Sequence, residues 1–257
     1  MSLTPLLAIE FPPISHLIEW PSLVGGNSPL AVNKVVIELL VSMLVTCTFY
    51  LVASRPRALV PKGAQNLAEA VIDFIQDDIV MQSMGTDGLG WTPFLLTLFS
   101  FIFVCNIWEV IPGVQMPATA RIALPAFLAM LVWLLYWIVG FKHQGFGYLK
   151  SSLFPPGVPW ILYILVTPIE LAQILIVRPL SLALRLFANM LAGHLLLVTF
   201  AVLSATLWAI PYFLASLLPA ALLVALTGFE ILVAVLQAFI FTILTAVYLG
   251  GSMHPEH

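Results

Sequence analysis

Long apolar tracts occupy most of this chain and set the strongest limit on what it can fold into. Of its 257 residues, 61% are hydrophobic and only 8% are charged, and the mean hydropathy is +1.09. Ordinary soluble domains carry about 25% charged residues, so a globular fold of this composition would have too little polar surface to face water. The composition therefore excludes a soluble enzyme, a nucleic-acid-binding protein and a disordered tail, and predicts a multi-span membrane protein.

The tracts predict an all-α integral membrane protein with five transmembrane helices and one amphipathic surface helix. Pro112 and Gly113 mark the turn of a helical hairpin, and Pro211 and Pro219 bracket the last connection. The expected segments of this single membrane domain are an external N-terminal segment (1–33), span 1 (35–53), the surface helix (64–82), the hairpin that holds two spans (91–141) and two long helices (160–207 and 219–250).

The last two helices are expected to be strongly tilted. As one helix, residues 219–250 would be about 48 Å long, whereas the hydrocarbon core of a bilayer is about 30 Å thick. Residues 160–207 are longer still, and Pro168 and Pro179 are expected to kink them.

The segment 64–82 has apolar residues at helical spacing and an acidic opposite face, which predicts an amphipathic helix that is too polar to span. Two interpretations of the acidic face stay open: it is solvated, or it docks on a basic partner. The apolar members are Leu67, Val71, Phe74 or Ile75 and Ile79, and the polar members are Glu69, Asp73, Gln76 and Asp77.

Basic residues in the short loops predict the orientation. They follow the first span and the third, and basic loops mark the cytoplasmic side. The N-terminus is therefore expected outside and the C-terminus inside. These residues are Arg55, Arg57, Lys62, Lys142 and Lys150; Arg121, in the hairpin turn, is the exception.

Ionisable residues inside the last two tracts are the strongest sign of function. A charge at the bilayer centre costs roughly 2.5–3.5 kcal/mol even on lenient insertion scales, so such residues are expected to face an aqueous cavity or a partner. Between residues 151 and 250 the charged residues are Glu170, Arg178, Arg185 and Glu230, and His194 adds one more ionisable group.

Helical spacing sorts these residues onto faces. At about 100° per residue, Arg185 and His194 lie on opposite sides of one helix, while Glu230 and Gln237 share a face of the next. The polar stripe on the Arg185 side consists of Arg178, Ser181, Arg185 and Asn189, and Tyr248 continues the line of Glu230 and Gln237.

Three segments carry a resemblance to a known family. The segments RPLSLALRLFANMLAGHLLL (178–197) and LQAFIFTILTAVYL (236–249) resemble subunit a of bacterial F-type ATP synthases, the stationary proton-channel subunit, and NIWEVIPGVQMPATA (106–120) fits the same family. The resemblance covers most of the chain from about residue 90 onward. The earlier residues match mainly in layout.

The resemblance implies roles for residues of the last two helices. Arg185 matches the essential arginine that faces the rotating c ring. Asn189 matches the asparagine one turn further on, and Gln237 matches a glutamine near that arginine. His194 and Glu230 match two polar positions of the half-channel open to the outside.

Two departures from the family pattern concern the acidic residues. Bacterial members commonly carry an acid at the position of His194 and a histidine at that of Glu230, so the pair is exchanged here. Glu170 resembles a family glutamate near the start of the fifth span. The segment from Glu170 to Pro179 is one residue longer than usual, which leaves the facing of Glu170 open.

The resemblance also implies the partners and the location. They are an oligomeric c ring, peripheral-stalk b-type subunits, a soluble ATPase head reached indirectly, and the lipid bilayer of a bacterial plasma membrane, with no nucleic acid. The chain has no G-x-x-x-x-G-K-[ST] motif, so no catalytic site of its own is expected. No cofactor is expected, and Cys47 and Cys105 indicate neither a disulfide nor a metal site.

Structural roles compete with these assignments. Arg185 would then pair with Glu230 or Glu170, His194 and Glu230 would be a static pair, and Asn189 and Gln237 would only join two helices. Arg178 is expected to brace its helix, and residues 106–109 together with Glu38 are expected to be interfacial. Two other classes also compete. A secondary ion-coupled transporter predicts two related halves with matching polar residues, which the sequence lacks, and the buried charges argue against a plain membrane anchor.

Overall fold

Helices are the regular elements of the part of the chain that the structure describes. The computed structural model describes residues 32–55, 62–111, 117–154, 159–208 and 213–253, and each element in these ranges is a helix. The prediction of an all-α membrane protein with five spans is confirmed. The stretches long and apolar enough to cross a membrane are Lys34–Ala53, Gly85–Ile107, Ala123–Gln144, Trp160–Trp208 and Ser216–Met253.

The helical elements follow one another with short connections. In chain order they are α2 (Lys34–Ala53), α3 (Ala64–Asp73), the π-helix η2 (Phe74–Val80), α4 (Met81–Ser83), the 3-10 helix η3 (Gly85–Trp91), α5 (Thr92–Ile107), the 3-10 helix η4 (Ala118–Ala120), α6 (Ala123–Gln144), α7 (Gly147–Leu153), the 3-10 helix η5 (Trp160–Leu162), α8 (Tyr163–Ala172), the π-helix η6 (Gln173–Val177), α9 (Arg178–Trp208) and α10 (Phe213–Met253).

The start of the last helix differs from the expected start. α10 begins at Phe213, before Pro219, and Pro219 lies inside it. Proline removes one N–H from the helical ladder, but membrane helices tolerate it because neighbouring groups satisfy the freed carbonyl. Pro112, Gly113 and Pro211, which were expected to mark turns, lie outside the described residues.

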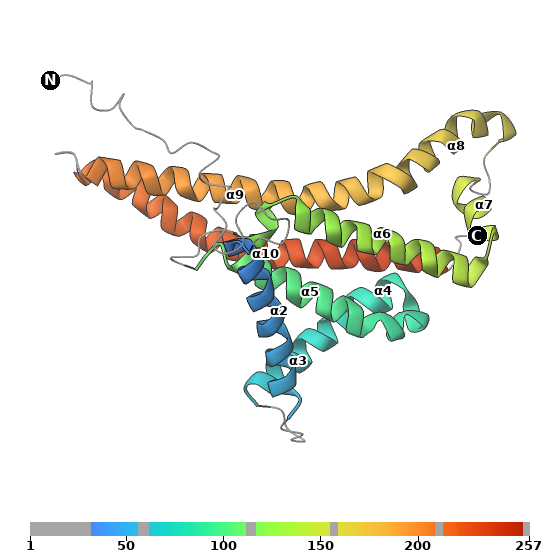
Figure 1. Cartoon of the computed structure of the whole chain (residues 1–257), viewed down its shortest axis with the longest axis horizontal. Coiled ribbons are helices and arrows are strands. Elements are labelled where there is room, and N and C mark those ends of the chain that lie inside the picture. The colour runs from blue at the N-terminus through green and yellow to red at the C-terminus, as the bar shows by residue number, and fades with distance from the viewer. Residues whose placement is uncertain (1–31, 56–61, 112–116, 155–158, 209–212, 254–257) are drawn as a thin grey trace.

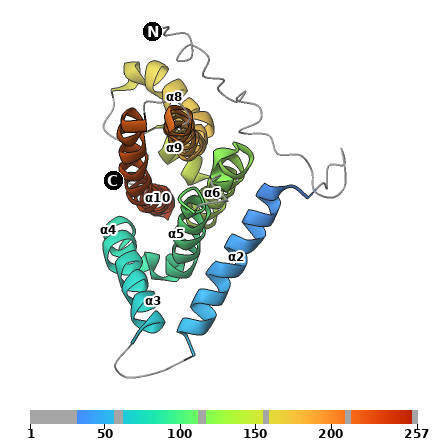
Figure 2. The ribbon, with the colours of Figure 1, turned by 90° about the vertical axis from the view of Figure 1, so that its left-hand side faces the viewer.

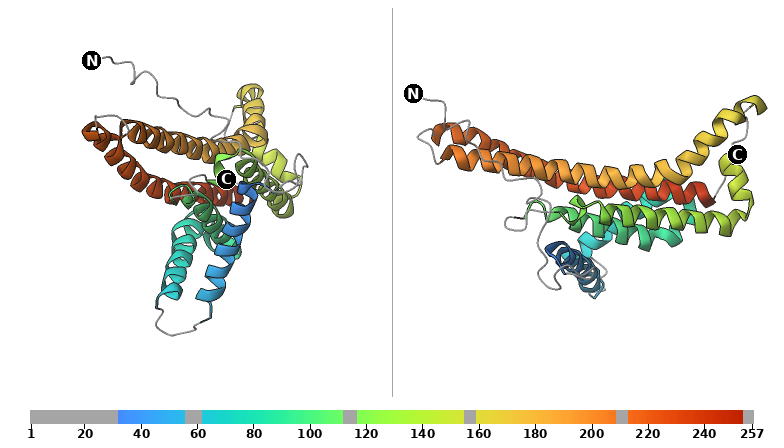
Figure 3. Two further views of the ribbon diagram at one scale, coloured as in Figure 1. Left: turned by 60° about the vertical axis from the view of Figure 1, so that its left-hand side comes forward. Right: turned by 45° about the horizontal axis from the view of Figure 1, so that its top comes forward.

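The long helices α9 and α10 form the spine of the molecule. They run side by side over most of their length, with α6 and α5 packed along one side of the pair and α2 and α3 projecting away from it (Figure 1). Figure 2, seen along the spine, places α2 and the arm of α3 and α4 on the far side of α5 from α9. Both views in Figure 3 show α8 bending away from the α9–α10 pair.

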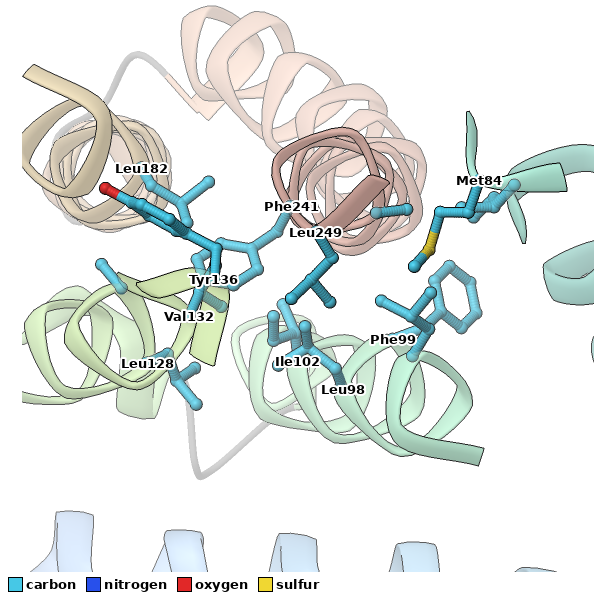
Figure 4. Close-up of a cluster of buried hydrophobic side chains, with 14 of the residues drawn as sticks. Met84, Leu98, Phe99, Ile102, Leu128, Val132, Tyr136, Leu182, Phe241 and Leu249 are labelled. Atoms are coloured by element: carbon cyan, nitrogen blue, oxygen red, sulfur yellow. The ribbon is translucent and has the colours of Figure 1, made fainter. Parts of the chain in front are cut away.

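Four helices share one apolar core. Tyr136 of α6, Leu182 of α9, Ile102 of α5 and Phe241 and Leu249 of α10 are almost completely buried there (Figure 4). Lipid chains are as apolar as these side chains, so the attraction between the helices comes from close contact rather than from the exclusion of water. The core therefore fixes how α9 and α10 lie against α5 and α6.

The predicted surface helix is present as α3, η2 and α4. Ile75 and Ile79 are fully buried, whereas Asp73, Asp77 and Asp78 are exposed. Its end is held against the last helix, since a Cβ added at Gly250 would lie 2.6 Å from the Ser83 carbonyl oxygen. The segment is thus docked on α5 and α10 through its apolar side.

Candidate functional site

The expected polar pair joins the two long helices. The Asn189 Nδ2 of α9 donates to the Gln237 Oε1 of α10 over 3.4 Å. Gln237 is buried, and Asn189 lies at the exposed margin of α9. The structure therefore brings these two predicted residues together, and it shows which side of α9 meets α10.

The carboxyl group of Glu230 lies directly against the backbone of α9. A Cβ added at Gly193 would be 2.6 Å from Glu230 Oε1 and 2.8 Å from its Cδ, so only glycine allows this approach. Glu230 is 4% exposed, and His194, the residue after Gly193, is 6% exposed. The acid and the imidazole from the predicted pair are thus both buried at one level of the α9–α10 contact.

Glu230 is incompletely satisfied in this position. Among the described residues, its Oε2 is a buried atom without a hydrogen-bond partner. An unpaired buried carboxylate is costly, so such a group either holds a proton or meets water or a partner. The position of Glu230 suits a group that takes up and releases a proton.

Arg185 lies on the other side of α9, as the helical spacing predicts. It is exposed and borders a shallow hollow on the surface of α9 together with Val177, Leu180, Ser181 and Leu184. Arg185 forms no salt bridge within the described part of the chain. The alternative of an ion pair with Glu230 or Glu170 is therefore not what the structure shows, and the charge is open to a partner outside this chain.

Arg178 and Glu170 lie nearer the other end of the spine. The Arg178 guanidinium carbon is 5.3 Å from the centre of the Tyr248 ring, a cation–π contact between α9 and α10. Glu170 is partly exposed on α8 and precedes Arg185 by about 22 Å along a helix. The structure does not bring Glu170 into the group around Arg185.

The π-helix η6 lies between these two regions. It spans Gln173–Val177, and a π turn holds one residue more than an α turn. One such turn would accommodate the extra residue that the family resemblance implies between Glu170 and Pro179.

A second buried polar group, which the sequence did not reveal, lies beside Glu230. Thr119 Oγ1 donates to Asn106 Oδ1 over 2.7 Å, and Glu109 next to them is 3% exposed. Asn106 and Glu109 are therefore buried within the protein, and their expected depth at the membrane interface stays a prediction. The short helix η4 that carries Thr119 packs on α9, which is why residues from the α5–α6 connection reach the α9–α10 site.

The surroundings of the Glu109 carboxyl group change its pKa. Burial and, to a smaller degree, the nearby negative charge of Glu230 raise the pKa of Glu109 from 4.5 to about 8. Two carboxyl groups in range of each other cannot both ionise at low cost. The negative charge of Glu230 therefore favours the protonated form of Glu109.

The fold and the site define a class: a multi-pass α-helical membrane protein with ionisable residues gathered where its two longest helices meet. The family described as ATP synthase A chain matches residues 35–250. The chain is 41% identical over 235 residues to ATP synthase subunit a of Frankia alni, covering 90% of this chain and 81% of that protein.

Two further relatives carry the same name. ATP synthase subunit a of Maricaulis maris is 42% identical over 228 residues, covering 85% of this chain and 87% of the relative. ATP synthase subunit a of a Methylobacterium species is 40% identical over 260 residues, covering 98% and 100%. The chain belongs to the ATP synthase A chain family.

Proposed function

We propose that this chain is the stationary proton-translocating subunit of a rotary F-type ATP synthase in a bacterial plasma membrane. One observation carries the proposal: Arg185 is exposed on the outer flank of α9, while His194 and Glu230 are buried on the opposite side, between α9 and α10. This arrangement fits two offset half-channels that meet a rotating c ring at Arg185.

In this proposal Arg185 is the barrier between the half-channels. Its guanidinium stays protonated under all physiological conditions, so it repels a proton that would pass directly from one half-channel to the other. It also favours the ionised form of a ring carboxylate that arrives beside it. Each ring carboxylate thus releases its proton near Arg185 and takes up another one before it returns to the lipid.

His194 and Glu230 are the proposed relay of the outer half-channel. An imidazole titrates near neutral pH, and the incompletely paired Glu230 carboxyl has an oxygen available for a proton. Glu109 lies within range of the Glu230 charge and extends the acidic path toward the α5–α6 connection. Asn189 and Gln237 link the relay to the Arg185 flank through their hydrogen bond.

Glu170 is the proposed ionisable group of the inner half-channel. It lies on α8, which bends away from the α9–α10 pair that holds Glu230 and has no buried residue among those described. The chain would work without a catalytic site or cofactor of its own, with the c ring, b-type stalk subunits and the ATPase head as partners. The basic residues Arg55, Lys62 and Lys142 support the proposed orientation, with the N-terminus outside and the C-terminus in the cytoplasm.

The decisive experiment replaces Arg185 in the assembled complex. Arg185→Ala should abolish proton-driven ATP synthesis and ATP-driven pumping in inverted vesicles, while the subunit still assembles with a c ring. Arg55→Ala removes the same charge from an exposed position after α2 and should leave both activities close to wild type. Normal coupled pumping by Arg185→Ala would overturn the proposal.

A secondary ion-coupled transporter remains the competing function. Reconstitution separates the two, because a transporter moves solute in proteoliposomes without other subunits. The purified chain alone should move none, and it should conduct protons in a controlled way only with a c ring.

A further inference from the structure

One turn between Glu170 and Arg185 departs from α geometry. In the π-helix η6 (Gln173–Val177), the Arg178 N–H bonds the Gln173 carbonyl, five residues back instead of four. The departure also has a local cause in the sequence. Pro179 follows directly and has no N–H to offer the carbonyls of this turn.

The Ile174 carbonyl is the group that this arrangement bypasses. Its usual donor, the Arg178 N–H, is directed to Gln173, and the residue after Arg178 is Pro179. A buried carbonyl without a donor is costly, and here α6 supplies the donors. The Tyr136 hydroxyl donates to the Ile174 carbonyl over 2.6 Å, and the Trp133 Nε1 donates to it over 3.2 Å.

These donors are rigidly placed. Tyr136 is among the most completely buried side chains of the core, and Figure 4 shows its hydroxyl directed toward the helix that carries Leu182. Trp133 comes from the preceding turn of the same helix. Both bonds converge on one carbonyl, so they hold the π turn at this place in the helix.

The position of the π turn decides which way Glu170 faces. Eight residues separate Glu170 from Arg178, so in an unbroken α-helix Glu170 would be rotated about 80° from Arg178. A π turn absorbs one residue and reduces the rotation to about 20° in the other direction. Arg185 follows Arg178 by seven residues, which is the same offset of about 20°.

We propose that the π turn of η6, held by Tyr136 and Trp133, is a register device that keeps Glu170 on the same flank of the spine as Arg178. With this turn in place, Glu170, Arg178 and Arg185 occupy equivalent positions of a seven-residue repeat. Such positions follow one seam along a partner helix. Tyr136 and Trp133 are thus positioning residues for Glu170, and the inference rests on the proton path proposed above.

When the two donors are absent, the π turn can form at another position of the helix. Pro168 breaks the ladder of α8 one turn earlier, so a π turn that loses its anchor is free to move toward it. A π turn on the other side of Glu170 would rotate that residue by about 100° relative to Arg178. Loss of the hydrogen bonds from Tyr136 and Trp133 therefore changes the face on which Glu170 lies, while every ionisable group stays in the chain.

A pair of matched deletions tests the register. Leu175 lies in the π turn and Leu184 in regular α-helix, and both are 41% exposed. Deleting Leu175 should convert the turn to α-helix, leave the faces of Glu170 and Arg185 unchanged and keep most proton-driven ATP synthesis. Deleting Leu184 rotates both Glu170 and Arg178 relative to Arg185 and should abolish it. Equal losses for the two deletions, at equal amounts of assembled subunit, would overturn the inference.

A double-mutant cycle tests the link between Tyr136 and Glu170 without changing chain length. Tyr136→Phe removes one donor and should lower proton-driven ATP synthesis about two- to tenfold, the range that one net hydrogen bond covers. In a Glu170→Gln background the same change should cost little more, because Tyr136 acts through Glu170. Additive losses would mean that Tyr136 only supports the fold, and would overturn the inference.

These tests separate the inference from the proposed function. If Arg185→Ala keeps normal coupling, the proton path itself is wrong. If Arg185→Ala is inactive while the Tyr136 and Glu170 losses add, the path stands and only the register device fails.

Discussion

The region around Glu230 and the region around Glu170 are built differently. Around Glu230 the ionisable side chains are buried within this chain: His194, Glu109 and Glu230 are each almost inaccessible. Around Glu170 the helix has no buried residue, and large apolar side chains such as Trp160 and Ile164 are mostly exposed. The region around Glu230 encloses its polar groups, while the region around Glu170 presents them on an open flank.

The difference indicates how much of each proposed half-channel this chain can form alone. The proposed relay near Glu230 already has walls from α9, α10 and the α5–α6 connection. The region near Glu170 has no such cover in the described part of the chain, so its second wall has to come from lipid or a partner subunit. The predictions below test this contrast in order of expected effect.

The largest effect is expected from neutralising the enclosed acid. Glu230→Gln removes a positioned proton-transfer group and should lower proton-driven ATP synthesis by on the order of a hundredfold. Glu170→Gln should cost less, because a group on an open flank is more easily replaced by water. Rates in inverted vesicles, normalised to assembled subunit, provide the comparison. A greater loss for Glu170→Gln would show that the open region around Glu170, and not the enclosed region around Glu230, is the more sensitive to loss of its acid.

The exchanged acid and imidazole provide the next test. His194→Glu alone places two carboxyl groups together, and because both cannot ionise at low cost, proton delivery should slow. Glu230→His alone leaves two imidazoles without a counter-charge. The double variant should couple better than either single variant, with an interaction energy of about 0.5–3 kcal/mol. A double variant that is the worst of the three would contradict a relay formed by the pair.

The close contact at Gly193 predicts a smaller loss. Gly193→Ala adds a Cβ that would lie 2.6 Å from Glu230 Oε1, so the carboxyl group has to move, at a cost of about 1–3 kcal/mol if its surroundings resist. Gly228→Ala is the matched control on α10, since a Cβ there has no neighbour within 4 Å. Only the first variant should slow ATP synthesis. Equal rates for both would show that Glu230 has room to shift.

The last expected effect concerns stability rather than rate. Because the folded chain raises the pKa of Glu109 from 4.5 to about 8, it retains this proton while the unfolded chain loses it. Stability should therefore fall as pH rises from 4.5 toward 8, by at most about 1.4 kcal/mol per pH unit. Glu109→Gln should flatten this part of the Tm–pH curve in detergent. An unchanged slope would contradict the burial of an ionisable Glu109.

Sequence reasoning reached the helices and the main polar residues for a physical reason. Apolar tracts of membrane length have few alternatives to helix, and ionisable residues such as Arg185 and Glu230 stand out inside them. The opposite facing of Arg185 and His194 also followed from spacing alone, because α9 is regular between them.

The remaining features depend on contacts that spacing does not encode. Residues 171–177 are apolar on nearly every side, so their pattern has no period that would reveal a π turn. The burial of Glu109 depends on η4 folding back against α9. Pro219 was read as a boundary, since proline usually ends helices, but α10 continues through it.

The contact between Gly250 and Ser83 has a consequence for the depth of α10 in the membrane. An amphipathic segment with exposed Asp73, Asp77 and Asp78 is expected to lie at the membrane surface. The close approach at Gly250 packs the end of α10 against this segment. That end of α10 is thereby held at the membrane–water interface. The 41 residues of α10 measure about 61 Å as a helix, so any overhang beyond the bilayer has to emerge at the opposite end, around Phe213.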